Sequence, residues 1–281
     1  MDTGVRLPAG SGFPVWPHRI NNGNIVKAEA KCFICSEKTD DGSIAVMKMY
    51  YQRGFANFIR EKIILFRAER EYRILCHLVR CGVSCSIPLN WTYGYCKEYG
   101  FYEILFTRQI PDTISLREFL SSTLIINNNI DWGPLFRLVH HMHSCGVYHG
   151  ALSTKNILID FRKGNACPNF YILDLARGWL FPRSIFGKKI AGFDLLKLVR
   201  NIEKEMGIGF CLPYLAQYGL EKEAFERFYR DVEHNKSYSR KLKRIKNILK
   251  VKVFLSAISA KFNLRGIGAN YFPILNRKHM H

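Results

Sequence analysis

The sequence predicts an α+β protein with a strand-rich first half and a mainly helical second half. Alternating or short apolar blocks, which indicate strands, occur at 25–26, 32–35, 44–50, 87–95, 101–107, 157–161 and 170–175. Apolar residues recur at helical spacing at 131–145, 188–206, 219–234 and 239–263. The 281 residues, 48% of them hydrophobic, suffice for two cores, so we expect two lobes.

One long helix and one short helix are predicted beside the early strands. Between residues 60 and 80 the apolar side chains fall on one stripe with charges between them, which is typical of an amphipathic helix. Gly82 is expected to end that helix. Ser115 is a candidate N-cap for the short helix, because Glu118 follows three residues later.

Composition divides the chain into five expected segments. They are a loose leader rich in Gly, Pro and Asn, a first lobe, a polar hinge, a second lobe, and a basic helical tail packed on or extending the second lobe. Their expected bounds are 1–24, 25–108, 109–114, 115–235 and 236–281.

Positive charge is concentrated at the end of the chain. The last 48 residues contain twelve Lys and Arg but no Asp or Glu, so they carry +12 of the formal net charge of +19. Such a field attracts polyanions. The tail also has apolar residues at helical spacing, which is typical both of an anchor at an anionic membrane surface and of a helix packed on the second lobe. Both interpretations stay open, whereas no motif indicates nucleic-acid binding, so we do not expect that partner.

The lack of a visible targeting signal and the pattern of cysteines favour a cytoplasmic location. No run of about 18 apolar residues appears, and residues 1–16 lack the charged and apolar regions of a signal peptide. Nine cysteines, an odd number spread over a long chain, favour reduced thiols over a disulfide framework.

Two short motifs in the second half place polar residues at the ends of apolar strands. Residues 149–156 form a loop that begins with His and closes with Asn156, and Asp174 follows another apolar strand about 18 residues later. This order is typical of kinases. Amide and carboxylate oxygens are the ligands that Mg²⁺ prefers, so Asn156 and Asp174 are candidate ligands for the metal that ATP carries.

The first half supplies a candidate phosphate-binding pair. Lys48 lies on a predicted strand, where a kinase lysine holds the α- and β-phosphates of ATP. Glu71 lies in the predicted helix that follows, where a carboxylate would hold the ammonium group in place. Glu69 is a rival partner, but the Glu-Tyr-x-Ile-Leu context favours Glu71.

Together these motifs resemble those of the lipopolysaccharide core kinases, the Kdo/heptose kinase family. The family's His-Gly-Asp-Leu-x-x-x-Asn-Ile-Leu loop is matched at 149–158 except at its Asp, and its Ile-Asp-x-x-Arg metal motif is matched at 173–177 with Leu for Ile. Further similar segments are 71–75, 81–83, 115–120 and 142–147. The resemblance extends over about residues 44–206. It implies a two-lobed protein-kinase-like fold, ATP and Mg²⁺ as cofactors, and an anionic glycolipid such as lipopolysaccharide core as acceptor at the cytoplasmic face of the inner membrane.

One position departs from the family in a way that matters for catalysis. Ala151 stands where the family has the Asp that accepts the proton of the attacking hydroxyl. Two hypotheses stay open: a slow or atypical phosphotransferase, and a non-catalytic pseudokinase that binds nucleotide or a partner at an anionic membrane surface. Asp160 lies beyond Asn156 on the next strand, so we do not expect it to replace the missing Asp.

Other polar residues are expected to have structural roles. His149 is expected to brace the loop, and Asp194 either hydrogen-bonds the loop backbone or caps its helix. Cys32 and Cys35 fall on opposite faces of a strand and are expected to be structural thiols rather than a zinc or redox pair. We expect packing rather than a metal site for His140, His141 and His143.

Overall fold

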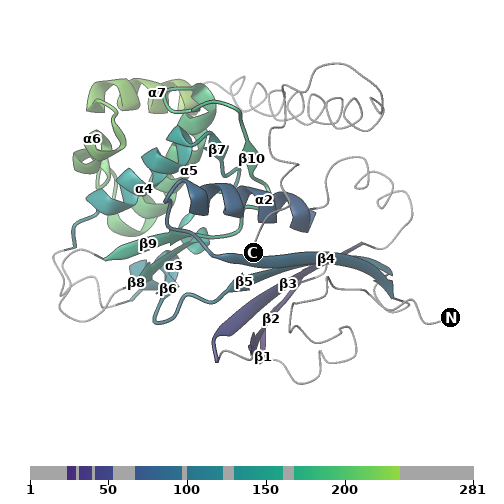
Figure 1. The fold of residues 1–281 in the computed structure, drawn as a ribbon. Helices are drawn as coiled ribbons and strands as arrows, with labels where there is room; N and C mark the ends of the chain where they lie inside the picture. Colours follow the sequence, from purple (N-terminus) through teal and green to yellow (C-terminus); the bar gives the residue numbers. More distant parts are fainter. Residues whose placement is uncertain are drawn as a thin grey trace, which may run out of the picture.

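The computed structural model describes residues 24–29, 32–39, 42–52, 67–96, 100–122, 130–160 and 168–234. They form a strand-rich first lobe and a helix-rich second lobe, as the sequence predicts (Figure 1). Three predicted segments lie outside the described residues: the leader up to residue 23, the tail at 236–281 with its helix at 239–263, and residues 60–66 of the first predicted helix. Asn24, the last residue assigned to the leader, instead begins a strand. The bounds drawn for the hinge and lobes stay predictions.

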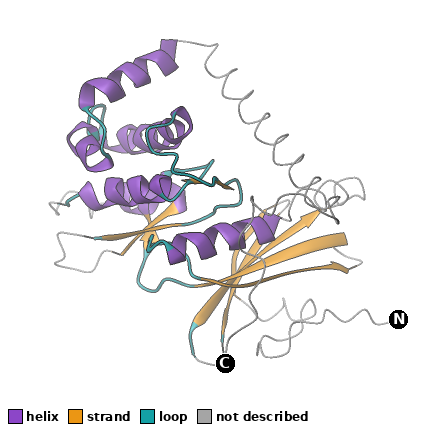
Figure 2. Ribbon diagram, turned by 45° about the horizontal axis from the view of Figure 1, so that its top comes forward, coloured by secondary structure: helices purple, strands orange, loops and turns teal. Residues whose placement is uncertain are grey.

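The first lobe is one five-stranded antiparallel sheet with a helix beside it (Figure 2). The strand order is β1-β2-β3-β5-β4, and every neighbouring pair is antiparallel. The elements are β1 (Asn24–Glu29), β2 (Cys32–Lys38), β3 (Ile44–Gln52), α2 (Arg67–Arg80), β4 (Pro88–Cys96) and β5 (Gly100–Arg108). The helix ends at the predicted place, because Gly82 adopts the left-handed φ of 74° in the turn that follows Arg80.

Alternation along β3 sends its side chains to two different environments. Met47 and Met49 are buried in a small apolar cluster with residues of β2 and β5. Lys48 and Tyr50 point to the opposite face, where both reach Glu71 of α2. The period-two pattern of one strand therefore separates a packing face from a polar face.

The second lobe combines two small sheets with a bundle of helices. One sheet has the order β6-β8-β9, and the other pairs β10 with β7. The elements are β6 (Ile114–Ser115), α3 (Leu116–Leu120), α4 (Gly133–Ser144), β7 (Val147–Tyr148), η3 (Thr154–Asn156), β8 (Ile157–Asp160), β9 (Asn169–Ile172), β10 (Trp179–Leu180), α5 (Lys189–Met206), η4 (Leu212–Tyr214), α6 (Leu215–Tyr218) and α7 (Lys222–His234). Ser115 and Glu118 form the predicted capping box of α3.

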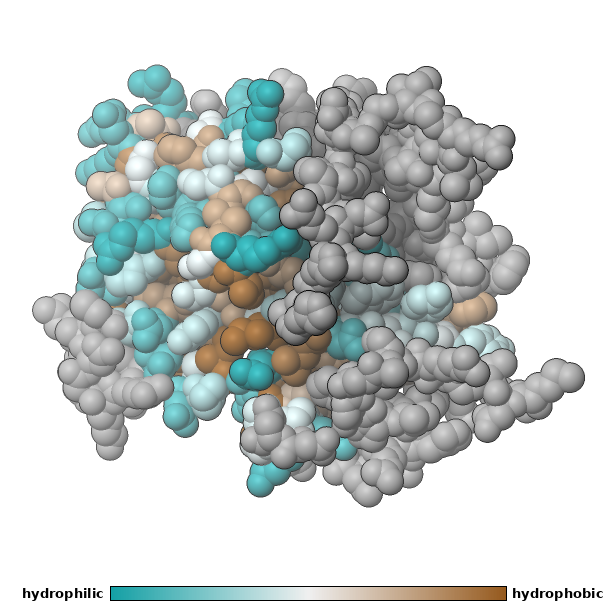
Figure 3. Space-filling view, in the orientation of Figure 1, coloured by the Kyte–Doolittle hydropathy of each residue, from teal (hydrophilic) through white to brown (hydrophobic). Residues whose placement is uncertain are grey.

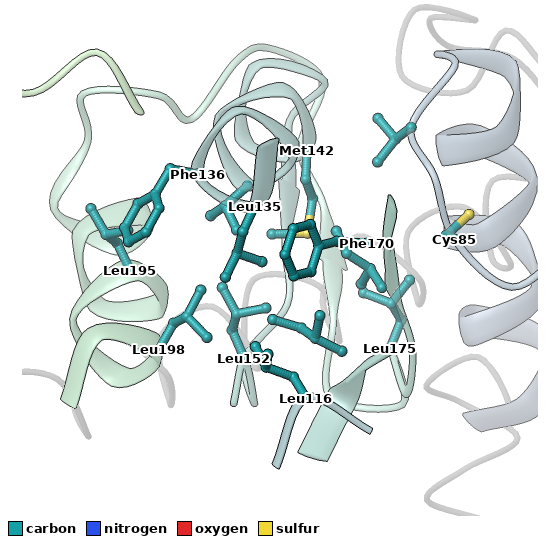
Figure 4. Close-up of a cluster of buried hydrophobic side chains, with 14 of the residues drawn as sticks. Cys85, Leu116, Leu135, Phe136, Met142, Leu152, Phe170, Leu175, Leu195 and Leu198 are labelled. Atoms are coloured by element: carbon teal, nitrogen blue, oxygen red, sulfur yellow. The ribbon is translucent and has the colours of Figure 1, made fainter. Parts of the chain in front are cut away.

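A single large apolar core joins the second lobe to the inner face of α2. In the second lobe it includes Leu135, Phe136 and Met142 of α4 and Leu195 and Leu198 of α5. Phe136 lies beside Leu195, whereas Met142 lies beside Phe170 of β9 (Figure 4). The α2 side chains that belong to the same core are Ile74, Leu75 and Leu78. Because the apolar side chains of α2 are closely packed in this core, the polar residues of α2 are fixed in position relative to the second lobe.

Three boundaries differ from the sequence prediction for local reasons. Helix α4 begins at Gly133 rather than at residue 131, because the Asp131 carboxylate accepts the Gly133 N–H ahead of the helix. The helix predicted from 219 begins at Lys222, because Gly219 has a φ of 81° and ends the preceding α6. Strand β9 stops at Ile172, two residues before the left-handed Asp174.

The cysteines and histidines named above lie in packed positions, except His141, which is exposed on α4, so the packing role expected for it is wrong. Cys35 is buried beside the β3 methionines, where burial and the nearby Glu37 raise its thiol pKa to about 11, and Cys32 packs against the large core instead. The ring of His140 meets that of Phe186 edge to face. Within the described ranges, no three His, Cys, Asp or Glu residues are grouped so that they could hold a metal ion.

The described surface seen in Figure 3 is hydrophilic at its left and upper margins, while hydrophobic residues gather toward its middle. No helix in the described part of the chain is both long enough and apolar enough to cross a membrane.

Candidate active site

Lys48 of β3 contacts carboxylates from both lobes. Its Nζ lies 3.3 Å from Glu71 Oε1 and 2.5 Å from Asp174 Oδ1. Glu71 comes from α2 of the first lobe, and Asp174 lies just after β9 of the second. The structure therefore brings together three of the four candidate residues, which are far apart in the sequence.

Glu71 is the centre of a buried hydrogen-bond network. Besides Lys48, it accepts hydrogen bonds from the Tyr50 hydroxyl at 2.6 Å and from the Leu175 N–H at 2.9 Å. The rival Glu69 instead pairs with Arg73, one turn further along the same helix. Because Glu71 is only 2% exposed, these donors fix its carboxylate in one place.

The ion pair keeps both Lys48 and Asp174 charged. Burial alone would lower the pKa of Lys48, but Glu71 and Asp174 outweigh it and raise the pKa above the ordinary 10.5. Burial alone would raise the pKa of Asp174, but the Lys48 ammonium outweighs it and lowers the pKa below the ordinary 3.8. The site thus holds an ammonium group between two carboxylates.

The stabilisation from this ion pair is expected to be independent of pH between about pH 5 and pH 9. The share from Asp174 is present above its unfolded pKa of 3.8 and is lost as the pH falls through the lower folded value. The share from Lys48 is present below its unfolded pKa of 10.5 and is lost as the pH rises through the higher folded value. Urea unfolding should show a constant difference in the free energy of unfolding between wild type and Asp174→Asn across that range. Below about pH 4 this difference should become smaller. A difference that varies between pH 5 and pH 9 would contradict the assignment.

His149 braces the loop, as the sequence predicts. Its Nε2 lies 2.9 Å from the Leu173 carbonyl, which can only accept, so Nε2 donates. Its Nδ1 accepts the Ala151 N–H at 3.3 Å. Burial lowers the pKa of His149, which keeps the ring neutral and suits this one-donor, one-acceptor arrangement. The ring therefore ties the loop to the chain just before Asp174.

Asp194 hydrogen-bonds the loop backbone, which decides between the two roles expected for it. Its carboxylate accepts the N–H groups of His149 at 2.6 Å and of Gly150 at 3.1 Å. It does not cap α5, because that cap position is Lys188. Asp194 is also 3.6 Å from His143, whose other ring nitrogen lies 2.7 Å from the Tyr218 hydroxyl. Three helices thus converge on the start of the loop.

Gly150 allows the loop to pass directly against the segment that follows Asp174. Its φ is 75°, and a Cβ at this position would lie 2.4 Å from the Arg177 carbonyl oxygen. Any other residue would force the two backbone segments apart. The second residue of the His-Gly motif is therefore explained by close backbone approach.

Gly150→Ala is expected to destabilise the protein more than Gly187→Ala, which serves as a matched control. Gly187 shares the left-handed conformation, with a φ of 73°, but a Cβ there would meet nothing within 4 Å. The conformational cost of about 1–2 kcal/mol applies to both, and the clash adds about 1–3 kcal/mol at Gly150 alone. Urea denaturation measures the free energy of unfolding of the two variants. Equal losses of this free energy would show that the close approach at Gly150 does not constrain the residue there.

Asn156 lies beside the residues that lead into Asp174. Its Nδ2 donates to the Ala151 carbonyl at 2.9 Å, and its own carbonyl accepts the Leu173 N–H at 2.9 Å. The first bond orients the amide and leaves its oxygen for another partner. The side chain of Asp174 is 45% exposed. The side-chain amide oxygen of Asn156 and a carboxylate oxygen of Asp174 could hold Mg²⁺. Two protein ligands suffice because the phosphates of ATP supply further oxygens.

The position of the family's catalytic Asp is occupied by a buried methyl group. Ala151 is 8% exposed, and its backbone is held by His149 and Asn156, so the loop keeps its hydrogen bonds without the carboxylate. Asp160 lies at the far end of β8, opposite Asn169 and 7% exposed. Four residues of strand separate it from Asn156 by about 13 Å, so it does not substitute.

Sequence reasoning missed several contributors to the site. Tyr50 could have been found from strand alternation, since it lies two residues after Lys48 and on the same face. His143 and Tyr218 carry no local signal, because their contact with each other depends on how α4 and α6 pack. Arg70 also escaped notice, although its guanidinium donates to the Ala176 carbonyl at 2.5 Å.

The sheet with helix α2 beside it, the lysine–glutamate pair and the loop-and-strand arrangement of the second lobe together define a protein-kinase-like fold. The model of the "Lipopolysaccharide kinase (Kdo/WaaP) family" matches residues 23–230. The chain belongs to this family, which implies ATP with a divalent metal.

Three known proteins show what the chain is similar to. The chain is 29% identical over 175 residues to the 3-deoxy-D-manno-octulosonic acid kinase of Pasteurella multocida (strain Pm70), covering 59% of this chain and 68% of the relative. The solved structure of WaaP in complex with acyl carrier protein is similar with a TM-score of 0.52 and 15% identity, covering 81% of this chain and 88% of that one. The solved structure of the Rio2 kinase from Chaetomium thermophilum has a TM-score of 0.49 and 13% identity, covering 86% of this chain and 74% of that one.

Proposed function

We propose that this protein binds Mg-ATP between its lobes and transfers the γ-phosphoryl group to a sugar hydroxyl of lipopolysaccharide core. The observation that carries the proposal is the position of the Lys48 ammonium between Glu71 and Asp174. That arrangement suits a triphosphate whose metal is shared with a carboxylate. Lys48 would hold the α- and β-phosphates, Glu71 would orient Lys48, and Asn156 and Asp174 would hold Mg²⁺.

The bound metal would neutralise charge that develops on the phosphate oxygens. The acceptor oxygen forms a bond to the γ-phosphorus while the bond to the bridging oxygen of ADP breaks. Ala151 cannot take the hydroxyl proton, so that proton leaves to solvent or to phosphate. Because phosphoryl transfer has a loose transition state, positioning and charge can still support turnover, at a rate reduced by about 10²–10⁴.

The acceptor we propose is an anionic glycolipid at the cytoplasmic face of the inner membrane. The named relative phosphorylates a sugar acid according to its name, and the net charge of +19 on this chain favours an anionic acceptor. The basic stretch at 236–281 would add attraction to anionic headgroups.

A second candidate is a pseudokinase that binds nucleotide without transferring phosphate. The observation that favours it is the buried methyl group of Ala151, which stands at the position of the general base. Such a protein would act as a nucleotide- or partner-binding module at an anionic membrane surface.

Phosphate transfer to a defined acceptor separates these functions. The protein would be incubated with Mg-ATP and a lipid A precursor that carries 3-deoxy-D-manno-octulosonic acid, and mass spectrometry would detect an added phosphate. The proposal expects slow phosphorylation by wild type and none by Asp174→Asn. An inactive wild type together with an active Ala151→Asp would favour the pseudokinase.

A further inference from the structure

Two neighbouring residues of α2 both reach the short segment that follows Asp174. Glu71 accepts the Leu175 N–H at 2.9 Å, and Arg70 donates to the Ala176 carbonyl at 2.5 Å. The helix therefore grips two consecutive residues of this segment, one through its N–H and one through its carbonyl. The first contact belongs to the network around Lys48, whereas the second has no part in binding phosphate.

Arg70 also contacts a second point of the same lobe. Its guanidinium lies over the Trp179 ring, 5.2 Å from the ring centroid. Trp179 begins β10 and pairs with Tyr148 of β7, the residue directly before His149. One side chain of the first lobe thus touches the segment after Asp174 and a strand paired with the start of the 149–156 loop.

The packing around this contact is close. A Cβ at Gly178 would lie 3.1 Å from Ile74 of α2 and 3.2 Å from the Tyr148 carbonyl oxygen. The absence of a side chain at Gly178 allows α2 and the 175–179 segment to approach each other. A planar guanidinium that donates at its edge and stacks with its face suits this narrow space better than a lysine ammonium.

We propose that Arg70 is a positioning residue that holds α2 against residues 175–179. Through this contact it keeps Glu71 on Lys48 and keeps Lys48 in register with Asp174. The inference rests on the proposed function, because its consequence for activity is felt through Mg-ATP. Arg70 itself touches neither nucleotide nor acceptor in this account.

The test compares Arg70→Met with Arg73→Met. Arg73 lies on the same helix and carries the same charge, but its contact is with Glu69, one turn earlier on α2, and not with the segment after Asp174. Calorimetric titration with Mg-ATP should show binding about tenfold weaker for Arg70→Met and within about twofold of wild type for Arg73→Met. Arg70→Lys, which keeps the charge and a donor, should lie between them.

Hydrogen exchange without nucleotide supplies a readout that does not depend on the proposed function. Arg70→Met should speed exchange in the 173–179 peptide, which contains the Leu175 N–H, while Arg73→Met should not. If wild type fails to bind Mg-ATP, the proposed function is wrong and exchange alone decides the role of Arg70. A lower melting temperature with unchanged affinity and unchanged exchange would overturn the inference, since Arg70 would then be only a packing residue.

Discussion

Glu71→Gln is expected to weaken Mg-ATP binding at least about tenfold and to lower the free energy of unfolding by about 2 kcal/mol. Three donors converge on the Glu71 carboxylate: the Lys48 ammonium, the Tyr50 hydroxyl and the Leu175 N–H. A glutamine has a single acceptor oxygen and must turn its NH₂ group toward one of these donors. The variant also removes the charge that holds Lys48, so the ammonium is no longer fixed for the phosphates.

Glu69→Gln is the matched control for this prediction. Glu69 lies two residues earlier on α2 and pairs with Arg73, whose side chain is 38% exposed. The Glu69 side chain is 12% exposed, so losing this i,i+4 pair should cost about 1 kcal/mol, less than the loss at Glu71, and should leave Mg-ATP affinity unchanged. Affinity by calorimetry and stability by urea denaturation check both variants. Equal effects of the two substitutions on affinity would refute the assigned role of Glu71.

Ala151→Asp is expected to raise the rate of phosphate transfer by about 10²–10⁴ while changing Mg-ATP affinity by less than about threefold. The loop around the position is already held by His149 and Asn156, which bond the backbone of Ala151 and not its side chain. A carboxylate added there would supply the missing proton acceptor to a site that otherwise has its charged groups assembled.

The control for this gain is Ala151→Asn, which has a similar shape but cannot accept the proton. Initial rates with saturating Mg-ATP and the glycolipid acceptor distinguish the two variants. If Asn raises the rate as much as Asp does, the gain comes from shape rather than from general-base assistance. No gain from Asp would mean that proton removal does not limit this protein.

Much of the site could be predicted because its residues sit in short, ordered motifs. The sequence placed Lys48 on a strand and Glu71 on a helix, and the structure joins them as expected. A close backbone approach at Gly150 could also be predicted, because a glycine in a motif often indicates one. That the approaching residue is Arg177 is known only from the fold. Alternation on β3 predicts which face carries Lys48 but not what covers that face.

The remainder depends on packing between distant elements. The position of Asp194 on α5 permitted two roles, and only the packing of α5 below the loop selects the hydrogen bonds to His149 and Gly150. Arg70 looks like an ordinary charge on a helix until Trp179 and Ala176 are brought beside it. The predicted helix boundaries were wrong where one residue changes the backbone conformation, as the left-handed Gly219 does.

Calorimetric titration of the wild-type protein with ATP, with and without Mg²⁺, is the decisive test of a nucleotide site in this protein. We expect one binding site per chain, with weaker binding when the metal is chelated and a similar loss of affinity in Asp174→Asn with Mg²⁺ present. Absence of binding, or binding that is indifferent both to the metal and to Asp174, would contradict a nucleotide site built around Lys48, Glu71 and Asp174.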